Sequence, residues 1–154
     1  MRVHLGSDHA GFDLKTAIAK RLREMGHESV DHGPPSYQPG DDYPPYIIAA
    51  AQGTVGDPGS LGVVIGGSGN GEAISANKVK GTRAVLVWNE ETARLGREHN
   101  NANVISLGAR EHAVADAVRF VEVFLATPFS EDPRHVRRLA MISHYERTGL
   151  IPSV

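Results

Sequence analysis

The chain has 154 residues, which is enough for one domain that buries a core without disulfide or metal support. It contains no cysteine, which excludes disulfides, thiolate zinc sites and a cysteine nucleophile, so a catalytic base would have to be Glu, Asp, His or Lys. A net charge of -2, no apolar run near the roughly 20 residues of a membrane span and no signal-peptide pattern lead us to expect a cytoplasmic domain over residues 1–154 that binds neither nucleic acid nor membrane.

Strand and helix patterns alternate along the chain. Expected strands cover residues 2–6, 28–31, 61–65, 83–88 and 104–107. Expected helices cover residues 10–25, 46–54, 72–78, 90–98, 112–126 and 132–147, and the proline-rich stretch 33–45 is expected to be a loop. This alternation predicts an α/β fold of three layers, a Rossmann-like open parallel sheet of about five strands with helices on both faces.

The segment 66–72, Gly-Gly-Ser-Gly-Asn-Gly-Glu, directly follows the apolar run 61–65. Glycines let backbone amides approach a ligand, but neither known glycine motif fits. A dinucleotide fingerprint needs Gly or Ala where Glu72 stands, and a phosphate loop needs Lys after Gly71. Because a carboxylate repels phosphate, Glu72 suits proton removal from a neutral carbon or hydroxyl while the amides hold the oxyanion. The alternative is a tight strand-to-helix connection with a solvated Glu.

Other polar side chains are expected at the carboxyl ends of the strands, where open parallel sheets bind ligands. Asp8 and His9 follow the first strand and Arg110 follows the last, and we expect the segment 97–101, which contains His99 and Asn100, to lie beside them. Asp8 suits either acid–base chemistry with His9 or the cap of the first helix. His99 suits either proton exchange with a sugar hydroxyl or a polar helix end.

Arg134, His135 and Arg138 form a further group on the last helix. A spacing of four places the two arginines on one helix face, and paired guanidinium forks match a dianionic ligand such as phosphate. The alternative is a solvated basic face. The spacing of the remaining histidines does not indicate a metal site.

Five motifs, in register over nearly the whole chain, resemble the type B ribose-5-phosphate isomerases, whose fold is shared by the galactose-6-phosphate isomerase subunits. They are residues 6–11 (Gly-Ser-Asp-His-Ala-Gly), 66–72, 97–103 (Arg-Glu-His-Asn-Asn-Ala-Asn), 108–110 (Gly-Ala-Arg) and 134–138 (Arg-His-Val-Arg-Arg). The resemblance implies an aldose–ketose isomerase without metal or cofactor that acts on an open-chain sugar phosphate through a cis-enediolate.

The resemblance also implies roles for individual residues. Asp8 and His99 would open the sugar ring, Glu72 would move the carbon-bound proton, and Asn100 would contact sugar hydroxyls. The developing enediolate oxygen would be held by Ser68 and the backbone of Gly67, Ser68, Gly69, Asn70 and Gly71. The phosphate would be surrounded by His9, Arg110, Arg134, His135 and Arg138.

The chain departs from many members of the resembled family at Gly66, where those members carry a cysteine base. A second, actinobacterial branch uses a Glu at the position of Glu72, and this chain resembles that branch. The family implies a homodimer with active sites at the subunit interface, with a tetramer as the alternative. Two other functions stay open: an isomerase of another sugar phosphate, such as allose or galactose 6-phosphate, and a nucleotide-binding regulatory module.

Overall fold

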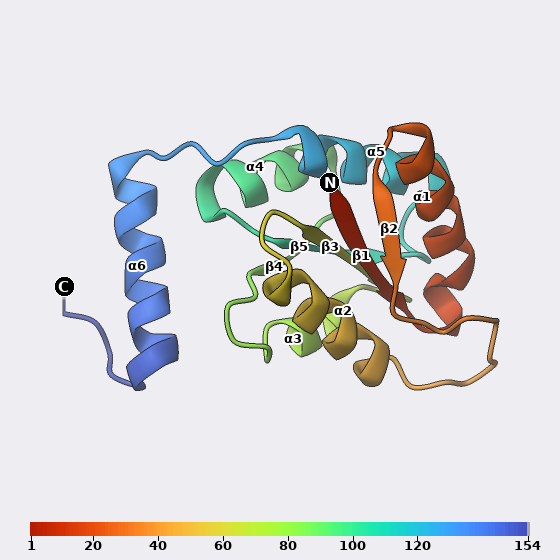
Figure 1. The fold of residues 1–154 in the computed structure, drawn as a ribbon, viewed down its shortest axis with the longest axis horizontal. Coiled ribbons are helices and arrows are strands. Elements are labelled where there is room, and N and C mark those ends of the chain that lie inside the picture. Colours follow the sequence, from red (N-terminus) through yellow and green to blue (C-terminus); the bar gives the residue numbers. More distant parts are fainter. Residues whose placement is uncertain (154) are drawn as a thin grey trace.

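A computed structural model describes residues 1–153 and contains one five-stranded sheet (Figure 1). The strand order is β2-β1-β3-β5-β4, and every neighbouring pair is parallel. The central strand β3 is buried along its whole length, as expected for a strand covered on both faces. The strands are β1 (Arg2–Ser7), β2 (Glu28–Asp31), β3 (Leu61–Gly66), β4 (Ala84–Leu86) and β5 (Val104–Gly108).

Helices cover both faces of this sheet, so the predicted three-layer α/β fold is confirmed (Figure 1). On one face α1 and α4 pack against α5, and on the other α2 packs against β1, β3 and α3. The helices are the short 3-10 turn η1 (His9–Gly11), α1 (Phe12–Glu24), α2 (Pro44–Gly56), α3 (Asn70–Ala76), α4 (Glu90–Asn100), α5 (Val114–Ala126) and α6 (Pro133–Thr148). The predicted bounds hold within two residues; strand 83–88 shortens to Ala84–Leu86, and the C-terminal end of α4 extends to Asn100.

The last helix, α6, stands apart from the sheet and contacts α4 (Figure 1). Only His135 in this helix is buried, whereas Val136, Ile142 and Tyr145 are exposed. A helix that leaves several large apolar side chains in water has a surface suited to another protein chain. Within residues 1–153 no helix combines the length and apolar character needed to cross a bilayer.

A buried lysine anchors the loop between β2 and α2. The ammonium group of Lys15, on α1, donates to Asp31 Oδ1 at 2.7 Å and to the carbonyl oxygen of Pro34 at 2.9 Å, and its side chain is only 2% exposed. The amide of Ser7 also donates to the carbonyl oxygen of Gly33 at 3.2 Å. These bonds hold the start of the loop against the end of β1.

Replacing Lys15 by Met should lower the free energy of unfolding by about 1–3 kcal/mol, because the Pro34 carbonyl loses its charged donor in a buried position. Urea denaturation at one fixed protein concentration measures the change. Lys20 is exposed on the same helix, and Lys20→Met should change the value by less than about 0.5 kcal/mol. Equal stabilities for the two variants would contradict the anchoring role.

Candidate active site

The carboxyl ends of β1 and β3 open into a pocket of about 400 Å³. These strands are neighbours whose connections leave in opposite directions, since β1 leads to β2 on one side and β3 leads to β4 on the other. Such a reversal is where open α/β sheets place ligands. The pocket is lined by Asp8, Tyr43, Gly67, Ser68, Gly71, Glu72, Arg110 and Glu111.

The carboxyl group of Glu72 lies directly over the Cα atom of Gly66. A methyl group built on Gly66 would overlap the Glu72 carboxyl carbon and oxygens, so only glycine at position 66 admits this side chain. Glu72 is 4% exposed, and burial raises its pKa above the usual range; the charge of Asp8 adds to this, while backbone hydrogen bonds partly oppose it. A carboxylate with a raised pKa, facing a pocket, suits a general base.

The glycine segment is held to the end of β5. The amides of Ala109 and Arg110 donate to the carbonyl oxygens of Gly66 and Gly67 at 2.8 and 3.1 Å, and Ser106 Oγ donates to the Gly69 carbonyl oxygen at 2.7 Å. Gly69 has φ 83° and stands directly before α3, a conformation that favours glycine. The loop therefore presents the first amides of α3, which have no intrahelical acceptor, beside Glu72.

Polar side chains surround the opening of this loop. Ser68 Oγ accepts hydrogen bonds from the Asn70 amide at 3.3 Å and from Asn70 Nδ2 at 3.2 Å, and both residues are exposed. Arg110 is exposed too, and its guanidinium lies against Gly67. The expectation that Ser68, the glycine backbone and Arg110 come together at one edge is thus met by the chain itself.

The two carboxylate oxygens of Asp8 make different contacts at this edge. Its Oδ1 accepts from the amides of Ala10 and Gly11 at 2.9 and 3.2 Å, so it caps the first helical turn as one of the two sequence interpretations expected. Its Oδ2 lies 3.9 Å from His9 Nδ1, which also contacts Asp41. Ligand atoms of Asp8, His9 and Asp41 lie within 4.8 Å of one another, a spacing that a metal ion would also fit.

Asp41 and Tyr43 reach the site from the loop after β2, and the sequence interpretation missed both. Tyr43 lines the pocket, and Asp41 accepts from the backbone amide and ring of His9. The signal was available, because the loop after any parallel strand leaves from the carboxyl edge. The expected strand 28–31 places residues 33–45 at that edge once it pairs with β1.

His99, Asn100 and the basic group of α6 lie at the opposite edge of the sheet. Asn100 ends α4, and only three residues separate it from the amino end of β5. A strand of five residues spans about 16 Å, so the expectation that this segment lies beside the glycine loop is wrong within one chain. There the His99 ring packs against the His135 ring, with centroids 4.3 Å apart and the ring planes tilted by 37°.

His135 is held by Ser130, whose Oγ lies 2.9 Å from its Nδ1. Burial, followed by the neighbouring His99 and Arg134, lowers the pKa of His135. Arg134 and Arg138 are exposed, and within residues 1–153 the carboxylate that pairs with Arg134 is that of Asp132, 3.6 Å away. This second cluster, defined by His99, Asn100, Arg134, His135 and Arg138, therefore combines exposed guanidinium groups with a histidine pair.

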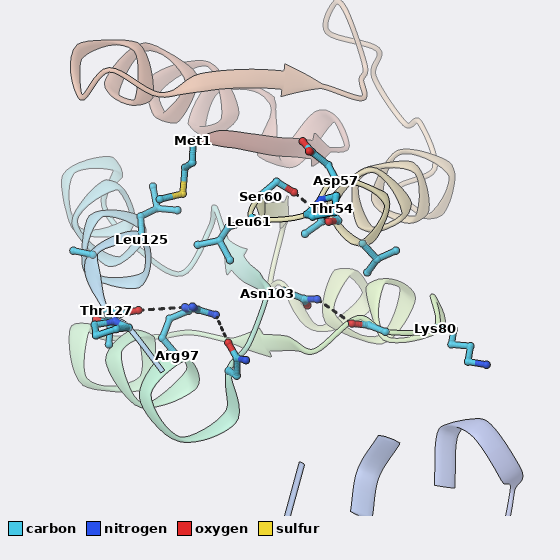
Figure 2. A pocket seen from close by; sticks show the side chains of 17 residues that line it. Met1, Thr54, Asp57, Ser60, Leu61, Lys80, Arg97, Asn103, Leu125 and Thr127 are labelled. Carbon is cyan, nitrogen blue, oxygen red and sulfur yellow. Dashed lines mark hydrogen bonds between the residues drawn. The ribbon is translucent and has the colours of Figure 1, made fainter. Parts of the chain in front are cut away.

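A hollow of about 720 Å³ also lies at the amino edge (Figure 2). The guanidinium of Arg97 borders it but donates to the Thr127 and Ala102 carbonyl oxygens and to Asn101 Oδ1. These acceptors follow the C-terminal ends of α4 and α5, where a cation is favourable. Arg97 thus stabilises helix ends.

Comparison with known proteins identifies the family of this chain. The family model described as Ribose/Galactose Isomerase matches residues 3–142. The chain is 56% identical to ribose-5-phosphate isomerase B of Mycolicibacterium paratuberculosis, over 100% of this chain and 97% of that protein. It is 54% identical to the enzyme of the same name from Mycobacterium tuberculosis, over 100% of this chain and 95% of that one.

Solved structures of this family have the same fold. The fold matches ribose-5-phosphate isomerase B of Mycoplasma genitalium, crystallised with bound ribulose-5-phosphate, with a TM-score of 0.91 at 37% identity over 96% of this chain and 97% of that one. It matches the enzyme of Clostridium thermocellum with a TM-score of 0.92 at 36% identity, over 97% of this chain and 100% of that one. The chain therefore belongs to the ribose/galactose isomerase family.

Proposed function

We propose that this chain is an isomerase that interconverts ribose 5-phosphate and ribulose 5-phosphate through a cis-enediolate. The observation that carries the proposal is the buried Glu72 carboxyl, which lies over Gly66 in the same pocket as the glycine loop. This carboxyl group occurs in a chain that is 54–56% identical to proteins named ribose-5-phosphate isomerase B. The proposed setting is the non-oxidative branch of the pentose phosphate pathway in the cytoplasm.

In the proposed reaction Glu72 takes the C2 proton of the open-chain aldose. The electron pair of that bond forms the C1–C2 double bond and leaves negative charge on O1, next to the amides of the glycine loop. Returning the proton to C1, while the proton of the O2 hydroxyl passes to O1, forms the C2 carbonyl and the C1 hydroxyl of the ketose. The positioned base contributes about 10²- to 10⁴-fold, and each oxyanion donor adds about 10²-fold or more.

The remaining roles require the second cluster. Asp8 and His99 are proposed to open the ring, Asn100 to contact sugar hydroxyls, and Arg134, His135 and Arg138 to bind the phosphate together with His9 and Arg110. Within one chain the second cluster lies at the far edge of the sheet. We therefore propose a homodimer in which the second cluster of one copy completes the pocket of the other.

Exposed apolar surfaces support this dimer. Val136, Ile142 and Tyr145 on α6 are 47%, 56% and 56% exposed, and near the carboxyl edge Trp88 and Val114 are 59% and 52% exposed. Two such surfaces on one chain suit an isologous pair, in which each copy covers the other and both sites form together.

The substrate is tested by a coupled isomerase assay on ribose 5-phosphate, allose 6-phosphate and galactose 6-phosphate. The highest kcat/KM is expected for ribose 5-phosphate. A higher value for a six-carbon sugar would reassign the substrate. No turnover of any sugar, together with tight binding of ATP or NAD measured by calorimetry, would favour a nucleotide-binding module.

Glu72→Gln should lower kcat by about 10²- to 10⁴-fold, because it preserves shape and removes the base. The variant should also be more stable at pH 7. The folded-state pKa of Glu72 is raised, so its protonated form favours the fold at low pH, and that contribution is lost as pH rises through the raised value. Glutamine keeps a neutral group there at every pH. Turnover near the wild-type value, or a loss of stability at pH 7, would contradict the assignment.

Mixing two inactive variants tests the shared site. Glu72→Gln and His99→Asn damage different halves, so a mixed dimer has one doubly damaged site and one intact site. Random reassembly makes half of the dimers mixed and should restore about a quarter of wild-type activity. A mixture of Glu72→Gln with Asp8→Asn is the control and should restore none, because both residues belong to one copy of the pocket. No recovery in the first mixture would place all these residues in a single chain.

A further inference from the structure

Asp41 makes two hydrogen bonds to His9 through one oxygen. Its Oδ1 accepts from the His9 backbone amide at 2.8 Å and lies 2.9 Å from ring Nδ1. The ring of Tyr37 stands edge-on to the His9 ring with centroids 6.4 Å apart. The loop after β2 thus contacts His9 at its backbone amide, at one ring nitrogen and on one side of its ring.

The surroundings decide which ring nitrogen carries a proton. Both groups within 4 Å of Nδ1 that can form an ion pair with it are carboxylates, Asp41 at 2.9 Å and Asp8 at 3.9 Å. A carboxylate only accepts, so Nδ1 carries the hydrogen and Nε2 faces away from both acids. The Asp41 side chain is 10% exposed, and its Oδ2 is buried without a partner among the described residues. Its known bonds are therefore all directed at His9.

We infer that Asp41 is a positioning residue, which fixes the ring plane and tautomer of His9 so that Nε2 meets the substrate phosphate. This inference rests on the proposed function, in which His9 contacts the phosphate. A phosphate oxygen at Nε2 accepts a hydrogen bond from a proton on that nitrogen, while Nδ1–H donates to the Asp41 carboxylate. Asp41 itself touches no substrate atom.

Contacts other than those of Asp41 also hold the loop in place. The start of the loop is anchored by Lys15 to the Pro34 carbonyl and by Ser7 to the Gly33 carbonyl. Its end continues into α2, where Ile47 is fully buried. Loss of the Asp41 carboxylate should thus free the His9 ring and leave the loop attached at both ends.

Asp41→Ala should raise KM for ribose 5-phosphate about tenfold and change kcat less than about threefold, as expected for loss of a charged hydrogen bond that acts on binding. Inorganic phosphate is the second probe, since it engages only the phosphate contacts. Its inhibition constant should rise by the same factor as KM. Asp116→Ala, an exposed aspartate on α5, is the matched control and should leave both constants unchanged.

A double-mutant cycle separates positioning from a general structural effect. In a His9→Ala background, Asp41→Ala should change KM by less than about twofold, because the group that it orients is already absent. A similar tenfold rise in both backgrounds would show that Asp41 acts on something other than His9. An unchanged KM for Asp41→Ala in the wild-type background would also overturn the inference.

The ring nitrogens give a readout independent of turnover. In 15N NMR spectra of the wild-type protein, His9 should show a protonated Nδ1, and Asp41→Ala should shift the ring toward the Nε2-protonated tautomer. Wild-type protein that does not isomerise ribose 5-phosphate would refute the proposed function while leaving this spectral test valid. Spectra with the same His9 tautomer in both proteins would refute the role of Asp41.

Discussion

All five strands run in the same direction, and this single constraint decides which residues of the chain can meet. Loops that follow the strands gather at the carboxyl edge, where Asp8, the glycine segment and Arg110 lie. Helices that return the chain end at the other edge, which is where α4 leaves His99 and Asn100. No local rearrangement within the sheet moves a residue from one edge to the other, so a site that uses both sets has to be divided between chains.

The fold class could be predicted from local sequence because each helix and strand has its own sequence signal. The buried run 61–65, the helix stripes and the glycine and proline breaks each predict an element without reference to the others. Strand order has no such local signal. Whether the loop at 33–45 reaches the site depends on that order. Asp41 and Tyr43 matter only because β2 pairs with β1, a long-range fact that composition does not reveal.

The site was predictable where neighbours in sequence are neighbours in space. Glu72 and Gly66 belong to one turn, and the choice of Glu72 as base followed from that turn. The Glu72 carboxyl group occupies the space over Gly66 because of side-chain packing. The spacing of residues along the sequence does not predict such packing. The placement of the segment 97–101 failed for the opposite reason. The segment is polar and ionisable, as predicted. It lies at the C-terminal end of α4, however, and was expected at the carboxyl edge of the sheet, where the strands end.

The use of a carboxyl group at position 72 also has a consequence for oxidative stress. A thiolate is converted by peroxide to sulfenic and higher acids, whereas a carboxylate has no such chemistry. The sulfur atoms of this chain belong to Met1, Met25 and Met141, and none of them lines the pocket with Glu72. Peroxide therefore has no sulfur to attack among the residues of this chain that line that pocket.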